Sequence, residues 1–183
     1  AALDRLNLNI HDARLHTTSD GSAFDVFYVL DEEDQPIGKD ALRCEKILKS
    51  LEQAISNPTE ICTDSSQRTP RQLKNFALKT SASLRQDIET NSSILEIITP
   101  DRPGLLAHLT QIFVRFELRV LNAKISTLGE RVEDIFYLTD NNFEPLSDDQ
   151  LSAALTKAIS TELDQRNEEE GQEYKLRKMK VWN

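Results

Sequence analysis

The sequence contains little of what marks several common protein classes. It has only two cysteines among 183 residues, Cys44 and Cys62, and no CxxC pair. A disulfide framework or a dithiol redox site is therefore not expected, and we expect both cysteines to be reduced thiols. No apolar run approaches the roughly 18 residues that a membrane-spanning helix needs. Hydrophobic residues make up 38% of the chain and aromatic residues 6%, so any hydrophobic core is expected to be modest.

The chain also lacks an excess of positive charge. Its formal net charge is −9, whereas a nucleic-acid-binding domain usually presents a basic surface. The sequence shows no nucleophile–base pair and no cluster of metal-binding residues, which argues against an enzyme that works alone. Residues 1–6 have neither the charged nor the apolar part of a signal peptide. They resemble the middle of a helix, so we expect the chain to be a segment of a longer protein.

The most informative segment is a strand–turn–helix pattern at 94–116. An apolar run is followed by the turn Thr99-Pro100-Asp101-Arg102-Pro103-Gly104, and apolar residues then recur at helical spacing. Pro103 fits the first turn of a helix, which needs no backbone N–H there, and Gly104 permits a close backbone approach. The first N–H groups of such a helix face whatever lies above the turn, and the helix dipole favours a negative group. The carboxylate of a small amino acid suits this position.

A second clue is internal similarity between the two halves of the chain. Residues 6–15 parallel 116–125, and residues 24–31 parallel 133–140. In each half, a short polar hairpin that contains a glycine joins two predicted strands, and a helix is predicted to follow. The predicted helices have apolar stripes at Cys44, Ile47, Leu48, Leu51 and Ile55, and at Leu151, Ala154, Leu155, Ala158, Ile159 and Leu163.

This repeat predicts an α+β fold of two tandem ferredoxin-like βαββαβ domains, each an antiparallel sheet with two helices on one face. The first domain, 1–86, lacks its opening strand and contains a predicted strand within 72–84. A polar linker, 87–93, leads to the second domain, 94–165, and the tail, 166–183, is either a last strand or a disordered end. The missing strand leaves an unpaired sheet edge. We expect a neighbouring chain or the tail to fill this edge, or the edge to remain a weakness.

These segments resemble the ACT domain, a small amino-acid-sensing module. The turn 101–105 resembles the strand-to-helix signature of that family, and the stretches 9–14 and 120–125 resemble its second strand. The resemblance implies a ligand between the turn of one domain and the second strand of its neighbour. The ligand-binding residues it points to are Asp101, Arg102, Gly104, Leu105 and Leu106 at the turn, and Asn9, Asp12 and Asn122 on the strands.

Several of these residues also have purely structural interpretations. Asp101 can serve as a helix cap, Gly104 can serve the turn alone, and Arg102 can be a solvent-exposed residue. His16 and His108 are expected on the surface. The dipeptide His11-Asp12 is half of a metal-binding motif, but its place in a predicted strand argues against a metal site.

The tandem arrangement, residues 70–76 and residues 95–107 together resemble the C-terminal region of the bifunctional uridylyltransferase/uridylyl-removing enzymes, over roughly residues 1–165. That family controls the PII nitrogen-signalling protein. The resemblance implies a non-catalytic, cytoplasmic regulatory part that senses L-glutamine and needs no cofactor of its own. High glutamine would favour removal of UMP from PII, and low glutamine its addition. The implied partners are the catalytic domains of the parent chain, which would use Mg, and a second copy in a homodimer; nucleic acid and membranes are not among them.

Two other function classes stay open on the sequence alone. ACT units also act as dimerisation or docking modules that bind no ligand, and the missing opening strand favours this alternative. A βαββαβ domain can also bind RNA through aromatic residues on its central strands, where Phe27, Tyr28, Phe136 and Tyr137 are predicted, but the acidic balance argues against RNA. The sequence does not identify a residue that would distinguish glutamine from glutamate.

Overall fold

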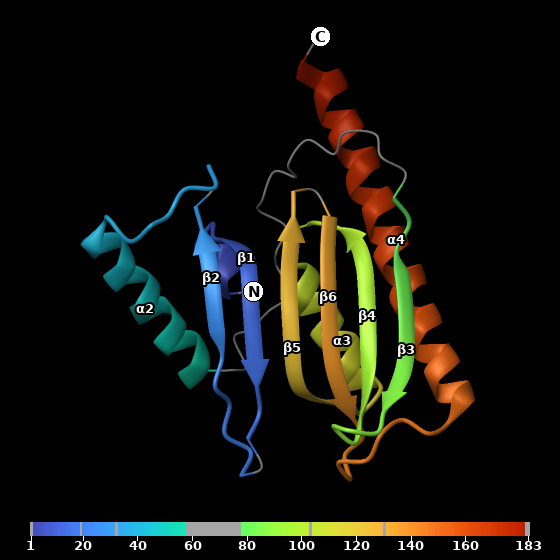
Figure 1. Cartoon of the computed structure of the whole chain (residues 1–183). Coiled ribbons are helices and arrows are strands. Elements are labelled where there is room, and N and C mark those ends of the chain that lie inside the picture. Colours follow the sequence, from blue (N-terminus) through green and yellow to red (C-terminus); the bar gives the residue numbers. More distant parts are fainter. Residues whose placement is uncertain are drawn as a thin grey trace.

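A computed structural model describes residues 2–18, 20–31, 33–57, 78–102, 104–129 and 131–181, with only the backbone for residue 4 and for 168–181. Its strands form one antiparallel sheet in the order β2-β1-β5-β6-β4-β3 (Figure 1). The strands are β1 Asn9–His16, β2 Val26–Leu30, β3 Ser81–Asp87, β4 Ser92–Pro100, β5 Arg119–Leu128 and β6 Arg131–Thr139. The helices are α1 Ala2–Arg5, α2 Ala41–Ser56, α3 Leu105–Arg115 and α4 Asp149–Val181. The predicted α+β class with an antiparallel sheet is confirmed.

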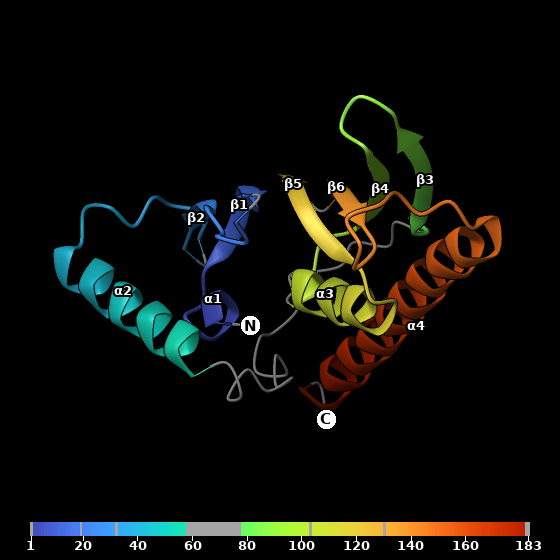
Figure 2. The ribbon, with the colours of Figure 1, turned by 90° about the horizontal axis from the view of Figure 1, so that it is seen from below.

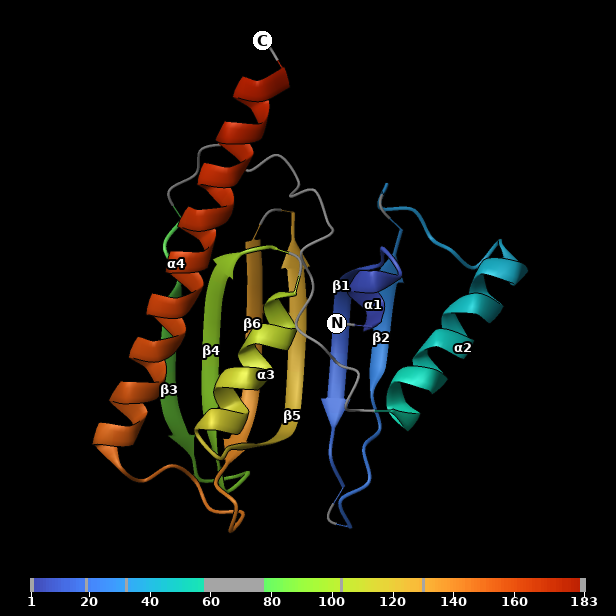
Figure 3. The same ribbon diagram turned by 180° about the vertical axis from the view of Figure 1, so that it is seen from behind.

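The helices lie on one side of the sheet and leave its other face uncovered (Figure 2). Helix α3 crosses the back of β4, β5 and β6, and α4 runs beside it (Figure 3). The apolar stripe predicted for α3 is buried: Leu109 and Ile112 are 0% exposed and Phe113 is 1% exposed. These residues join the inward faces of β4, β5 and β6 in one core cluster. The sheet therefore has one apolar face that packs against α3, and the turn before α3 connects this helix to the end of β4.

Strand β3 comes before β4 in the chain and pairs with it as the outermost strand of the sheet. Residues 87–93, predicted as a linker between domains, instead form the turn and the inner ends of this hairpin. Leu84 packs against the core, and the Thr80 N–H donates to Asp164 Oδ1 of α4 at 2.8 Å. The strand predicted in the first domain thus completes the sheet of the second half. The part of that prediction at 72–77, like Cys62, lies outside the described residues.

The two halves meet where β1 pairs with β5. The register of this ladder is symmetric about the pair Arg14–Lys124, whose members are 110 residues apart. When 110 is added to the number of each β1 residue and subtracted from that of its β5 partner, the outer pairs convert into one another and the central pair stays unchanged. The pairs are Asp12–Ser126, Ala13–Ile125, Arg14–Lys124, Leu15–Ala123 and His16–Asn122. Ala13 is 0% exposed, so the junction belongs to the buried core.

The outer edge of β2 has no strand partner within the described part of the chain. Near this edge Phe24 is 70% exposed and Tyr28 60%, and on α2 the apolar residues Leu48 and Ile55 are 61% and 79% exposed. Helix α2 lies away from the sheet (Figures 1 and 2). This is the edge that the sequence predicted to lack a strand, and the tail does not fill it.

The tail continues α4 to Val181, where the sequence predicted a strand or a disordered end. Residues 164–181 contain no proline and are rich in Glu, Gln, Lys and Arg, which favour helix over strand. The helix starts at Asp149, within the polar segment 147–150. Its cap is Asp148, whose Oδ1 accepts from the N–H groups of Gln150 and Leu151 at 2.7 and 3.3 Å.

Candidate functional site

The candidate site is the turn between β4 and α3. Gly104 is the N-cap residue of α3 and adopts the left-handed conformation with φ 74°, which costs glycine much less than a residue with a Cβ. The Leu105 N–H donates to the Arg102 carbonyl at 3.3 Å. Leu105 is 4% exposed, so its side chain packs in the core while its backbone stays at the helix start. Pro103 lies outside the described residues. The turn therefore aims the positive end of α3 at the end of the sheet.

Arg102 is buried and His108 is partly buried. This corrects the expectation that His108 lies on the surface and the alternative interpretation of Arg102 as a solvent-exposed residue. Arg102 is 6% exposed, and its Nη2 donates to His108 Nδ1 at 3.0 Å. His108 Nε2 then donates to Glu162 Oε2 of α4 at 3.3 Å, because a ring whose Nδ1 accepts carries its proton on Nε2. Burial and the charge of Arg102 lower the pKa of His108 below its ordinary value. A neutral histidine thus connects the turn to the last helix.

Glu162 is the point where this network meets solvent. It accepts from His108 and also from Arg115 of α3. Burial alone would raise the pKa of Glu162, but the hydrogen bonds from Arg115 and His108 outweigh it and lower this pKa. The network joins the turn and α3 to α4 by polar contacts, in addition to the apolar core.

Replacing Glu162 by Gln is expected to reduce the free energy of unfolding by about 1–2 kcal/mol, because two charge-assisted hydrogen bonds become weaker. The matched control is Glu133→Gln, since Glu133 pairs with Arg131 at the surface, where an ion pair contributes about 0–1 kcal/mol. Urea denaturation at pH 7 measures both changes. Equal losses in the two variants would show that the network adds nothing to an ordinary surface pair.

Sequence reasoning missed one buried acid that interacts electrostatically with the turn, Asp134 on β6. It is 1% exposed, and Val132 and Phe136, two residues away on either side, are core residues that share its face of the sheet. Its Oδ1 accepts from the Ser126 N–H at 3.3 Å. Its Oδ2 is buried without a hydrogen-bond partner in the described structure. The available signal was an acid at an inward position of an alternating strand.

Burial raises the pKa of the Asp134 carboxyl from 3.8 to about 7. The hydrogen bond from Ser126 opposes this shift, and the negative charge of Asp101 adds to it. Asp134 is therefore electrostatically coupled to the predicted site residue at the turn. A strongly perturbed carboxyl next to a candidate binding turn is typical of functional sites.

The structure separates the three strand residues predicted to contact a ligand. Asn122 pairs with Tyr137 of β6, whereas the residue that leads into the turn, Pro100, pairs with Arg131. Six residues along a strand span about 20 Å, so Asn122 does not lie at the turn. Asp12 pairs with Ser126 nearer the turn, but it alternates with the buried Ala13 and faces away from α3.

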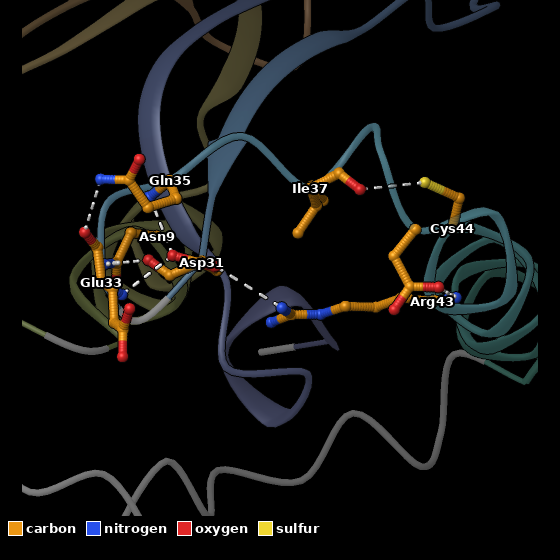
Figure 4. Close-up of polar contacts among 8 residues, drawn as sticks. Asn9, Asp31, Glu33, Gln35, Ile37, Arg43 and Cys44 are labelled. Carbon is orange, nitrogen blue, oxygen red and sulfur yellow. Dashed lines mark hydrogen bonds and ion pairs between the residues drawn. The ribbon is translucent and has the colours of Figure 1, made fainter.

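Asn9 lies at the same end of the sheet as the turn and is held by the loop after β2 (Figure 4). Its Nδ2 donates to the Asp31 carbonyl at 3.1 Å and to Asp34 Oδ1 at 3.2 Å. Asp31 in turn forms an ion pair with Arg43 of α2 at 3.6 Å. Asn9 therefore orders this loop in addition to any contact with a ligand.

Other kinds of site were also sought. Within the described ranges no three His, Cys, Asp or Glu residues are grouped so that they could hold a metal ion. In the same ranges no helix combines the length and the apolar character needed to cross a membrane. Cys44 is a free cysteine whose Sγ lies 3.6 Å from the Ile37 carbonyl oxygen (Figure 4).

No known family model matches this sequence. It is 49% identical over 170 residues to the bifunctional uridylyltransferase/uridylyl-removing enzyme of Stutzerimonas stutzeri, an alignment that covers 93% of this chain and 19% of that enzyme. The enzyme of the same name from Pseudomonas syringae pv. tomato is 46% identical over 171 residues, with coverage of 93% and 19%. The one from Azotobacter vinelandii is 47% identical over 163 residues, with coverage of 89% and 18%.

These curated relatives are much longer than this chain, which spans about a fifth of their length. The predicted resemblance is confirmed: over about nine tenths of its residues, the chain is homologous to part of the bifunctional uridylyltransferase/uridylyl-removing enzymes.

Proposed function

We propose that this chain is the amino-acid-sensing part of a bifunctional uridylyltransferase/uridylyl-removing enzyme, and that its ligand is L-glutamine. In this role it shifts the parent enzyme between adding UMP to the PII protein and removing it. The names of the relatives support the parent activity. The observation that carries the sensing role is the turn before α3, a glycine-capped helix start whose Asp101 interacts electrostatically with the buried carboxyl of Asp134.

The proposal includes a tandem pair of ACT-type units. Besides the symmetric β1–β5 ladder, local features recur at a spacing of 110 residues. Asn7 and Glu117 both have φ 56°, and each precedes a residue whose N–H returns to a helix: Leu8 to Leu3 at 3.1 Å and Leu118 to Phe113 at 2.9 Å. The register shifts in the two strands follow the same spacing, at Ile10/Asp12 and Val120/Asn122.

On this interpretation α1 is the end of a helix equivalent to α3, and β1, β2 and α2 are equivalent to β5, β6 and α4. A ligand at the β4–α3 turn binds one arrangement of the two units better than another. It can shift their equilibrium only by its differential affinity, which is typically about 1–3 kcal/mol. The contacts from Arg102 through His108 to Glu162 supply a route from the turn to α4.

Isothermal titration calorimetry with L-glutamine, L-glutamate and L-serine tests the sensing role. We expect saturable heat with L-glutamine alone. Asp101→Ala is expected to weaken binding at least tenfold, because it removes a charge from the turn. Asp25→Ala, an exposed acid on the other half of the sheet, serves as the matched control and is expected to bind like the unmodified chain. A folded sample that gives no heat with any of these amino acids would contradict the sensing role.

We further propose that the uncovered edge of β2 forms a homodimer contact, in line with the alternative function as a docking module. The exposed apolar residues on β2 and α2 support this, and an unpaired strand edge readily pairs with a second copy of itself. We propose the catalytic domains of the parent chain as the other partners. Within this segment we propose no cofactor, and any Mg belongs to those domains.

Light scattering after size-exclusion chromatography tests the dimer. We expect the mass to rise toward that of two chains as concentration increases, and Tyr28→Lys to suppress the rise by placing charge on the edge. Val114→Lys is the control, because Val114 is an apolar residue 75% exposed on α3, away from the edge. Suppression by both variants, or by neither, would exclude β2 as the contact.

A further inference from the structure

Asp134 is a buried acid whose surroundings offer it little compensation. Ile97 lies directly opposite it on β4, and Ile125, the core residue before Ser126 on β5, is 2% exposed. The Ser126 N–H is its one hydrogen-bond donor among the described residues, and Oδ2 receives none. The charge that acts on it most clearly among the described residues does not neutralise it, because Asp101 on the turn repels its ionised form.

A buried carboxylate without a cation is costly, so such a group either keeps a proton or acquires a positive partner. Asp134 lies on the sheet face that packs against α3, and it interacts electrostatically with Asp101 of the turn. Two opposite charge preferences therefore act in this region. The start of α3 favours a negative group, and the two carboxyls of Asp101 and Asp134 favour a positive one. A free amino acid carries both charges on neighbouring atoms, so its backbone matches this pair of preferences.

We propose that Asp134 binds the α-ammonium group of the amino acid while the N–H groups at the start of α3 bind its α-carboxylate. This inference rests on the proposed function and adds a binding residue to it. An ammonium has three N–H donors, enough to satisfy the unpartnered Oδ2 of Asp134 and a further acceptor. Because Asp134 is 1% exposed, the ligand reaches it only when the residues packed around it move apart.

Ligand binding is then coupled to proton release. At pH 7 an acid with a pKa of about 7 is about half protonated, so binding of the ammonium expels about half a proton per site into the buffer. As pH increases toward 7, the affinity for the amino acid increases about tenfold per pH unit, and it levels off above pH 7. The reason is that only the ionised carboxyl accepts the ammonium. His108 does not obscure this dependence, because its lowered pKa leaves it neutral near pH 7.

The test is calorimetry of the full chain with two ligands, L-glutamine and glutaramate, which is L-glutamine without its α-amino group. Titrations at pH 7 in buffers of different ionisation enthalpy count the protons released. The unmodified chain is expected to prefer L-glutamine to glutaramate at least tenfold and to release about half a proton. Asp134→Asn, which keeps the shape of the side chain, is expected to lose both the preference and the proton release.

The outcomes separate this inference from the proposed function. Binding of L-glutamine that keeps its preference over glutaramate in Asp134→Asn, with unchanged proton release, overturns the role of Asp134 and leaves the sensor intact. Absence of L-glutamine binding to the unmodified, folded chain overturns the proposed function and this inference with it. Circular dichroism and a thermal melt verify that each variant is folded.

Discussion

Replacing Asp134 by Asn is expected to stabilise the protein at pH 8 by about 2–3 kcal/mol. The pKa of Asp134 is raised from 3.8 to about 7 by burial, so between these values the folded state keeps a proton that the unfolded state has lost. Stability therefore falls as pH rises through this window and stays at its lower level above it. About three pKa units correspond to about 4 kcal/mol of destabilisation, which the variant avoids. The unpaired amide group of the buried Asn destabilises the variant by about 1–2 kcal/mol, which leaves the net gain given above.

The gain in Asp134→Asn must depend on pH in a defined way. At pH 5 the folded acid is mostly protonated, but the unfolded acid is mostly ionised, so about 1.6 kcal/mol of the destabilisation is already present. The cost of the Asn amide offsets this amount, and the expected difference between the variant and the unmodified chain is close to zero. Urea denaturation at pH 5 and pH 8 measures this, with Asp25→Asn as the exposed control. His108, whose lowered pKa makes stability rise with pH up to about its ordinary value, contributes equally to both proteins and cancels. A gain that is equal at both pH values, or a loss at pH 8, would contradict the burial of an uncompensated carboxyl.

Truncating Phe113 to Ala is expected to lower the free energy of unfolding by about 3–5 kcal/mol. Phe113 is 1% exposed at the centre of the core. Its ring meets that of Phe136 edge to face, with centroids 5.0 Å apart and an interplanar angle of 70°. The change removes the apolar area of the ring, leaves a cavity and breaks this aromatic pair, which alone contributes about 0.5–1.5 kcal/mol.

The neighbour of Phe113 provides the control for this change. Val114 is 75% exposed on the same helix, so Val114→Ala is expected to change stability by less than about 0.5 kcal/mol. Guanidinium denaturation of the two variants and the unmodified chain makes the comparison. A loss below about 1 kcal/mol for Phe113→Ala would mean that α3 does not pack on β6 as described.

The local parts of the fold were predictable because their signals are periodic. The apolar stripe of α3 predicted a buried face, and Leu109, Ile112 and Phe113 are indeed buried. The alternation along β6 predicted a strand with an inward face. The pairing of β3 with β4 was not predicted, because the partner of a strand depends on which edge of the sheet is unpaired. In addition, the short polar turn between these two strands resembles a linker between domains in sequence. The helical end of α4 was missed, because the tail 166–183 was predicted to be a last strand or a disordered end in spite of its helix-forming composition.

Only the part of the candidate site that depends on backbone conformation could be predicted from the sequence. Gly104 and the start of α3 follow from the residues of the turn, and the structure places them as expected. His108 was expected on the surface, and Arg102 was open to that interpretation, because the sequence pattern of α3 does not show that Glu162 of α4 contacts His108. Asp134 lies 33 residues beyond Asp101 in the sequence, and only the pairing of β6 with β4 brings the two charges within electrostatic range of each other.

The central claim is that L-glutamine binds at the β4–α3 turn. The most direct measurement is amide chemical-shift mapping of the ¹⁵N-labelled chain during a titration with L-glutamine. The predicted result is saturable shifts at Gly104, Leu105 and Leu106, and smaller ones at Asn122 on the far part of β5. Shifts confined to β2 and α2, or no shifts at a saturating concentration of L-glutamine, would contradict the claim.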